Sequence, residues 1–277
     1  MDDMLSSLTH YTWQTMALRA VRKTLIAFAG CVFLAATATE AVAQSKSPAR
    51  SWRAAARHSA GMAPDPAALK NTNIVQVYAA STWGWRGNFA VHTWLIFKRA
   101  DDNAYTRYDV VGWRKPNVVQ RNYGPPDGYW YGSAPQLLVD HRGPHVAQMI
   151  DEIETAIADY PYADTYKSYP GPNSNTFLAH IGRQVPALQL DLPANAIGKD
   201  YRPLYQPIGL STSGTGIQAS LLGLLGVTLG WEEGLELNLL GLHFGIDLNR
   251  PALRLPFIGR LGMSDTTYTK GAANAHQ

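Results

Sequence analysis

Three stretches in the first half of the chain are dominated by β-branched and aromatic residues, a composition that favours extended strands. They cover residues 74–78, 90–97 and 105–113, and turns rich in Gly, Asn and Asp separate them. A fourth short strand is predicted over 128–131. Strands joined by short turns of this kind indicate an antiparallel sheet.

Two helices follow these strands in the sequence. The first opens at Pro144, and its apolar residues recur at spacings of three and four, so they share one stripe of a helix. The second runs from about Asn173 to Val185 and stops before Pro186, which cannot continue a helix. The predicted fold class is therefore α+β, with an antiparallel sheet that carries His92 packed against both helices.

The C-terminal third has a different pattern. After an irregular stretch with several prolines, the sequence from Ile217 onward is rich in glycine and leucine. Apolar and polar residues alternate over 235–239 and 246–248, and this period of two predicts strands or a hairpin. A contact between residues 217–230 and a membrane surface is an alternative, although the run is far shorter than the ~20 apolar residues of a spanning helix.

The N-terminus has the three parts of an export signal. Basic residues precede a mostly apolar run over 24–37, and an Ala-x-Ala-like cleavage site ends at Ala43. Met16 is the expected start, and we predict a periplasmic protein, or one anchored at the membrane by this segment if it is not cleaved. The predicted division is a signal peptide over 1–43, a linker over 44–72, a single α+β domain over 73–263 and a flexible tail over 264–277.

Composition and charge narrow the functional classes. Hydrophobic residues make up 46% of the 277, which is enough for a sizeable core. The net charge is +3 and no basic run of five residues occurs, so nucleic acid is not an expected partner. The single cysteine lies in the predicted signal, which leaves the mature chain without a thiol nucleophile or a thiolate metal ligand. We predict no metal and no cofactor.

Ser174, at the start of the second helix, is the candidate nucleophile. The first turn of a helix presents free N–H groups and the positive dipole end, which stabilise an anion. At ~100° per residue, Ser174 shares a helical face with Phe177 and Ile181, so its hydroxyl is expected to point inward. His92, on the strand predicted over 90–97, is the candidate base. Two plainer interpretations stay open: Ser174 as the N-cap of the helix, and His92 as a hydrogen-bonded histidine in an aromatic core.

A residue on the next strand is expected to orient the imidazole of His92. Asp109 fits by charge, Tyr108 fits if the strand faces the other way, and the sequence leaves both open. The N–H groups of Ser174 and Asn175 would stabilise an oxyanion. A catalytic pair requires His92 and Ser174 to face one cleft, and His92 on the face of the sheet opposite to the helix would contradict it. The predicted substrate-binding residues are Trp83, Trp85, Trp94, Asn173 and Asn175.

Several motifs between Arg57 and Gly262 are similar to those of an uncharacterised bacterial family, domain of unknown function 3750. That resemblance implies no known activity. The motifs that carry it are Ser59–Pro66, Thr82–Gly87, Phe89–Trp94, Gly171–Phe177, Ala196–Tyr201 and Glu232–Asn238.

A more distant resemblance implies chemistry. In circularly permuted papain-like folds, the NlpC-type and lecithin-retinol acyltransferase-like group, a strand histidine precedes a helix whose first turn carries Asn-Cys-x-x-Phe. His92–Trp94 and Asn173–Phe177 resemble that pair, with Ser174 in the cysteine position. Because a serine hydroxyl is a much weaker nucleophile than a thiolate, two hypotheses follow. One is a Ser174/His92 hydrolase or acyltransferase acting on an envelope amide or ester. The other is a non-catalytic envelope module that binds a glycan, peptide or lipid in the same cleft.

Overall fold

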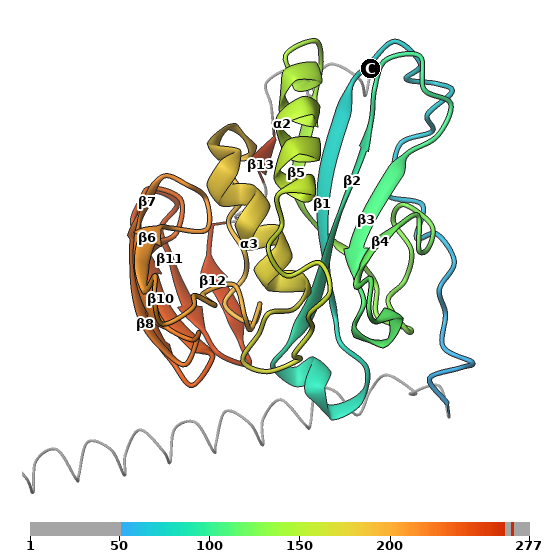
Figure 1. Cartoon of the computed structure of the whole chain (residues 1–277). Helices are drawn as coiled ribbons and strands as arrows, with labels where there is room; N and C mark the ends of the chain where they lie inside the picture. The colour runs from blue at the N-terminus through green and yellow to red at the C-terminus, as the bar shows by residue number, and fades with distance from the viewer. Residues whose placement is uncertain (1–50, 264–266, 269–277) are drawn as a thin grey trace, which may run out of the picture. The chain divides into compact units, whose positions relative to one another are not determined.

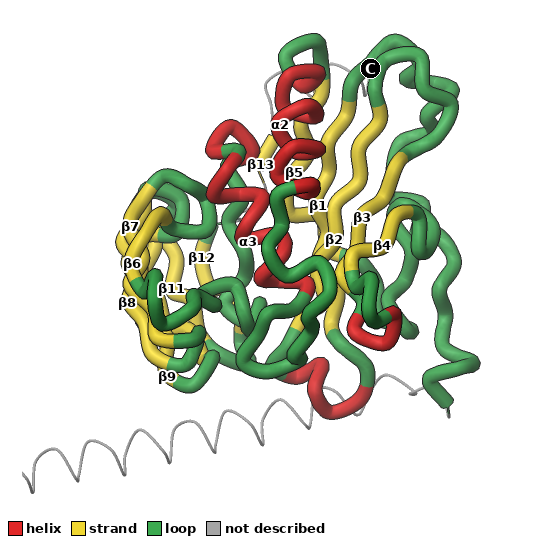
Figure 2. The backbone as a smooth tube through the Cα atoms, in the orientation of Figure 1, coloured by secondary structure: helices red, strands yellow, loops and turns green. Residues whose placement is uncertain are grey.

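A computed structural model describes residues 51–263 and 267–268, and Figure 1 and Figure 2 show the arrangement of its elements. The predicted signal over 1–43, the first residues of the expected linker and nearly all of the predicted tail lie outside the described residues. No described helix is long and apolar enough to cross a bilayer. Two mainly antiparallel sheets and the helices packed beside them confirm the predicted α+β class.

The first sheet has the strand order β13-β5-β1-β2-β3-β4, and every neighbouring pair is antiparallel except β13 with β5. The strands predicted over 74–78, 90–97 and 105–113 correspond to β1, β2 and β3. The strand predicted over 128–131 is wrong, because only isolated bridges occur there. The strands of this sheet are β1 (Ile74–Ser81), β2 (Val91–Lys98), β3 (Thr106–Val110), β4 (Val119–Arg121), β5 (Gln136–Arg142) and β13 (Thr267–Tyr268).

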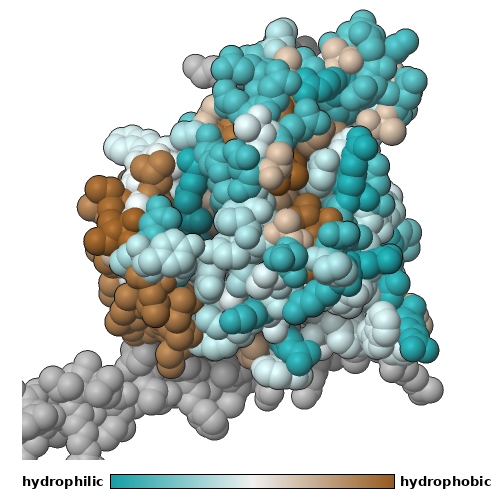
Figure 3. Space-filling view, in the orientation of Figure 1, coloured by the Kyte–Doolittle hydropathy of each residue, from teal (hydrophilic) through white to brown (hydrophobic). Residues whose placement is uncertain are grey.

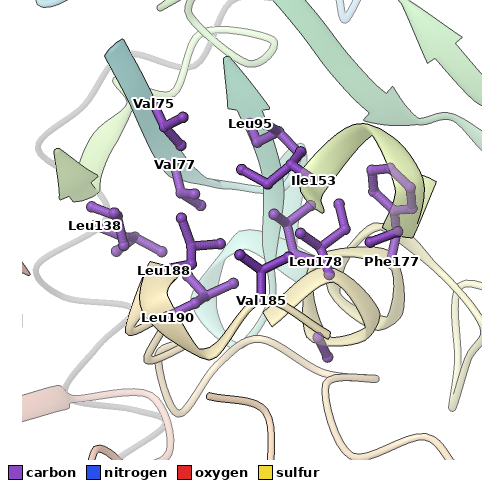
Figure 4. Packing of buried hydrophobic residues seen from close by; sticks show 14 of the residues in the cluster. Val75, Val77, Leu95, Leu138, Ile153, Phe177, Leu178, Val185, Leu188 and Leu190 are labelled. Atoms are coloured by element: carbon purple, nitrogen blue, oxygen red, sulfur yellow. The ribbon is translucent and has the colours of Figure 1, made fainter. Parts of the chain in front are cut away.

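Helices α2 (Val146–Ala158) and α3 (Ser174–Gln184) cover one face of this sheet (Figure 1). Their apolar stripes pack on the residues of β1 and β2 that point to the same side, so one continuous core forms (Figure 4). That core includes Val75, Val77, Leu95, Ile153, Phe177 and Leu178. The alternate residues of β1 and β2 form a second, aromatic cluster on the other face, which includes Tyr78, Trp94, Ile96 and Trp130. Short 3-10 helices occupy Gly84–Asn88, Gly112–Arg114 and Pro186–Leu188.

Residues 51–72, part of the expected linker, are attached to the first sheet's aromatic side. Ala55 is buried in the aromatic cluster. The Asp127 carboxylate accepts hydrogen bonds from the Ser59 hydroxyl at 2.6 Å and from the Met62 and Ala63 amides at 2.5 and 3.0 Å. These contacts fix the segment against the domain.

The second sheet is a seven-stranded meander in the order β12-β11-β10-β9-β8-β7-β6. It includes the strands predicted after Ile217, and an irregular segment over 189–207 connects it to the helices. Its buried face carries polar and charged side chains, whereas its exposed face is apolar (Figure 3). The strands are β6 (Ile208–Leu210), β7 (Gly216–Leu221), β8 (Leu225–Gly230), β9 (Gly234–Leu239), β10 (Leu242–Asp247), β11 (Ala252–Leu255) and β12 (Gly259–Gly262).

Candidate functional site

The N-terminus of α3 is closed by Asn173. Its Oδ1 accepts hydrogen bonds from the amides of Asn175 at 2.9 Å and Thr176 at 3.2 Å, and the Thr176 hydroxyl accepts one from the Asn173 amide at 3.1 Å. This reciprocal pattern is a capping box, in which Asn173 is the N-cap. Ser174 is the first helical residue, so its interpretation as the N-cap is wrong. The backbone N–H of Asn175 donates to the cap residue Asn173 and is not available to an oxyanion. The backbone N–H of Ser174 has no acceptor among the described residues.

Hydrogen bonds hold the first turn of α3 against the start of β2. The Thr93 hydroxyl donates to the Ser174 carbonyl at 3.3 Å and to Asn175 Oδ1 at 3.0 Å, and Asn175 Nδ2 donates to the Val91 carbonyl at 3.1 Å. The Ser174 hydroxyl takes no part in this network and has no hydrogen-bond partner in the described part of the chain. It lies in the wall of a cavity.

His92 is held by a carboxylate and an indole. Its Nε2 lies 2.8 Å from Asp109 Oδ1, and its ring stacks flat on Trp130, with centroids 3.6 Å apart and an interplanar angle of 8°. Asp109 also accepts hydrogen bonds from Arg107 Nε at 2.6 Å and Nη2 at 2.9 Å. All three polar side chains are buried.

The two pKa shifts at this pair fix its protonation state. Burial lowers the pKa of His92 below its ordinary value, and does so by more than Asp109 raises it. Burial alone would raise the pKa of Asp109, but Arg107 and His92 outweigh it and hold this pKa below its ordinary value. Asp109 is therefore ionised and can only accept, so His92 Nε2 carries the proton and Nδ1 keeps a free lone pair at neutral pH.

Asp109, not Tyr108, is the partner of His92. Adjacent residues of a strand point to opposite faces, and β3 directs Asp109 toward the aromatic cluster. Tyr108 points to the helix side, where its ring stacks on that of Phe97 with the ring centroids 6.1 Å apart. The prediction that Tyr108 orients the imidazole is wrong for this reason.

Both candidate residues line one cavity of about 730 Å³. Of the predicted substrate-binding residues, Trp83 and Trp85 contribute to its wall. Trp94 does not, because it is fully buried behind the imidazole of His92. Asn173 and Asn175 border the cavity, but their side chains are engaged in the cap and in contacts with β2. The aromatic lining residues are Trp52, Trp83, Trp85, Phe89, Trp113, Trp130, Tyr131, Tyr166 and Tyr169.

The two residues reach this cavity from different faces of β2. Thr93 points to α3, so its neighbour His92 points to the aromatic face, and His92 and Ser174 are not hydrogen-bonded to each other. The expectation that His92 lies on the helix side is therefore wrong. By the condition set from the sequence, this placement counts against a Ser174–His92 catalytic pair. The other condition, one cleft contacted by both side chains, is met, because β2 pairs with β3 only from Leu95 onward. The open end of β2, Val91–Trp94, allows one cavity to contact both side chains.

Residues 72–201 match the model of a family described as protein of unknown function, DUF3750. The chain contains a DUF3750 domain. The match confirms the resemblance seen in the sequence over these residues, and it includes His92, Asp109 and Ser174. The motifs at 59–66 and 232–238 and the second sheet lie outside it. Neither a curated protein nor a solved structure matches the chain.

Two elements of the site in the DUF3750 domain were not predicted as site residues. Trp130 supplies the surface on which His92 stacks, and Arg107 holds the Asp109 carboxylate. The period of two along β3 places Arg107 and Asp109 on the same face, which is a signal for the second of these contacts. No cluster of three His, Cys, Asp or Glu side chains suited to a metal ion occurs among residues 51–263 and 267–268.

Proposed function

We propose that this protein is an exported serine acyl-transfer enzyme that acts on an amide or ester of the cell envelope. One observation carries the proposal: the unbonded Ser174 hydroxyl and the Asp109-bound imidazole of His92 line the same aromatic cavity. A hydroxyl needs a positioned neutral base to become a nucleophile, and His92 is in the required protonation state.

In the proposed reaction, Ser174 Oγ bonds to the substrate carbonyl carbon while its proton passes to His92 Nδ1. The carbonyl oxygen becomes an oxyanion, which accepts a hydrogen bond from the free backbone N–H of Ser174. When this intermediate collapses, the carbonyl re-forms, and the bond to the amine or alcohol breaks as that group takes the proton from His92. Water, or a second alcohol or amine, then cleaves the acyl-Ser174 ester by the same steps, so the enzyme is a hydrolase or an acyltransferase.

The same arrangement supports a permuted papain-like core. A histidine on β2, its carboxylate partner on the adjacent β3 and a nucleophile at the first position of a later helix follow the chain order of the NlpC-type and lecithin-retinol acyltransferase-like folds. The capping residue Asn173 and Phe177 complete the Asn-x-x-x-Phe spacing of that helix. Fold resemblance does not carry function, so the activity rests on the site.

A second candidate function is a non-catalytic module that binds an envelope glycan, peptide or lipid in this cavity. The observation that favours it is the position of His92, which stacks on Trp130 on the face away from α3 and is not bonded to Ser174. The aromatic wall provides stacking surfaces for sugar rings or apolar contacts for acyl chains.

The thiol pKa of the Ser174→Cys variant, in a Cys31→Ser background, distinguishes the two functions without a known substrate. If His92 accepts the proton of residue 174, the rate of alkylation by iodoacetamide should rise with pH. The midpoint of that rise should lie well below the pKa of a free cysteine, ~8.5. Adding His92→Gln should move the midpoint back toward that value. A midpoint that His92→Gln leaves unchanged would exclude the pair and favour the binding module. Thermal melts of each variant check that the fold is retained.

A further inference from the structure

The second sheet has an apolar outer face that extends across all seven strands. One lateral row places an exposed aliphatic side chain on every strand in register, each between 47% and 67% exposed. Val227 and Leu237, which are paired on β8 and β9 and are 42% and 50% exposed, extend the face beside this row. The row is Leu210, Ile217, Leu229, Leu235, Ile246, Leu253 and Leu261.

The polar residues of the same strands point inward, where each finds a partner. Lys199 Nζ lies 2.8 Å from Glu236 Oε2, and His243 Nε2 lies 2.9 Å from Asp200 Oδ2. Arg254 donates to Asp191 and Glu236. Burial alone would raise the pKa of Asp200, but His243, Lys199 and Arg183 outweigh it and hold this pKa below its ordinary value. The polar contacts with the segment before β6 therefore fix which face of the sheet is outward, and the aliphatic row from Leu210 to Leu261 stays exposed.

The area of the outer face is that of a continuous apolar patch and not of single exposed leucines. The seven strands are three to six residues long, and with ~3.3 Å per residue and ~4.8 Å between strands they span roughly 550 Å², before the relief of the side chains is counted. This area is close to the upper limit of the largest apolar patch on a typical monomer, roughly 300–600 Å². It is smaller than the ~800 Å² that each partner contributes to a standard protein interface.

The rim of the face indicates what covers it. Protein interfaces have a polar rim and about one hydrogen bond per 100–200 Å². Here the turns at the edges of the sheet also expose large apolar side chains, among them Trp231, Leu240 and Leu248 at 67%, 68% and 82%. An apolar rim with an exposed indole suits the boundary between lipid headgroups and acyl chains.

We propose that the outer face of β6–β12 docks onto a phospholipid bilayer and inserts its aliphatic side chains just below the headgroups. The nearby arginines are turned inward to carboxylates, Arg254 to Asp191 and Arg260 to Asp247. Binding therefore depends on buried apolar area and not on lipid charge. The docked sheet holds the DUF3750 domain at the membrane surface, and this inference does not depend on the reaction at Ser174.

A fluorescent label reports the docking directly. In the full chain with Cys31→Ser, a nitrobenzoxadiazole label is placed at Leu237→Cys in the outer face or, as a control, at Gln148→Cys on the exposed side of α2. With neutral phosphatidylcholine vesicles, the label at position 237 should brighten and be quenched by brominated acyl chains, while the label at position 148 should do neither. The response should persist in high salt.

A charge-neutral variant of the face provides the matched test. Ile217→Lys, Leu229→Glu, Leu235→Lys and Ile246→Glu place opposite charges on paired strands, which supports the sheet while replacing four of the seven residues of the apolar row. The affinity for vesicles, measured with the label at position 237, should fall about tenfold or more in this variant. A variant with valine at the same four positions should nearly retain the affinity. Thermal melts confirm folding.

Three results would overturn the proposal. The first is no quenching at position 237. The second is equal quenching at positions 148 and 237, which would assign the binding to the N-terminal segment. The third is lipid-free brightening at position 237 that depends on protein concentration, together with a dimer in sedimentation that the charged variant dissociates, which would assign the face to a second copy of the chain.

Discussion

Replacing Asn173 by alanine should destabilise the protein, whereas the same change at its neighbour Ser174 should leave its stability nearly unchanged. Asn173 Oδ1 accepts the Asn175 and Thr176 amides, and its Nδ2 donates to the Ile197 carbonyl at 3.0 Å and the Ser168 carbonyl at 3.3 Å. Loss of an N-cap costs ~0.5–2 kcal/mol, and the lost donor adds ~0.5–1 kcal/mol, because the Ile197 carbonyl keeps its bond from Asn175 at 2.8 Å. Asn173→Ala should therefore destabilise the protein by about 1–3 kcal/mol.

Ser174→Ala removes a hydroxyl that makes no hydrogen bond within the described chain. Alanine also has the higher helix propensity, so the change in unfolding free energy should stay within ~0.5 kcal/mol of zero. For a domain of this size, ~2 kcal/mol corresponds to a Tm shift of about 4–8 °C, which melts followed by far-UV circular dichroism resolve easily. Asn173→Asp keeps the cap acceptor and is the control. A Tm loss for Ser174→Ala equal to that of Asn173→Ala would refute the assignment of Asn173 as the cap and of Ser174 as a free hydroxyl.

Three further predictions concern the parts that hold the site. Asp109→Asn should slow any Ser174-dependent acylation at least ~10-fold. The asparagine amide can donate its NH₂ to His92 Nε2 and so stabilise the tautomer with the proton on Nδ1, which cannot accept the Ser174 proton; unchanged rates would contradict the assigned tautomer. Because burial lowers the pKa of His92, acylation should be constant above the ordinary histidine pKa of about 6.5 and should decline only at lower pH, whereas a decline that begins above this value would contradict the shift. Thr93→Val should lower Tm by about 2–6 °C, since Asn175 Oδ1 and the Ser174 carbonyl lose their donor, and Thr93→Ser should restore it.

The helices and the central strands were predictable because their periods are regular. The stripe of α2 and the β-branched run of β2 identify their elements without tertiary information. The sequence leaves Ser174 open as the N-cap, one residue after the actual cap Asn173, because asparagine and serine cap equally well and only the position of the first helical residue separates them. The sequence of β2 shows that His92 and Thr93 point to opposite sides, but not which side α3 covers.

The second sheet shows a limit of pattern alone. Alternation of Leu235 and Leu237 with Glu236 and Asn238 predicts two faces, and the general rule would bury the leucines. The structure buries the polar face instead, because Lys199 and Asp200, far away in the sequence, provide its ion pairs and hydrogen bonds. Those partners lie in an irregular segment without a periodic signal.

Covalent labelling of the native protein shows whether Ser174 is a nucleophile that His92 activates. The protein is incubated with a fluorophosphonate probe, and the modified peptide is identified by mass spectrometry. We expect an adduct on Ser174 that is absent in Ser174→Ala and forms much more slowly in His92→Gln. No adduct on Ser174 in the folded protein, or an adduct whose rate of formation is the same in His92→Gln, would contradict it.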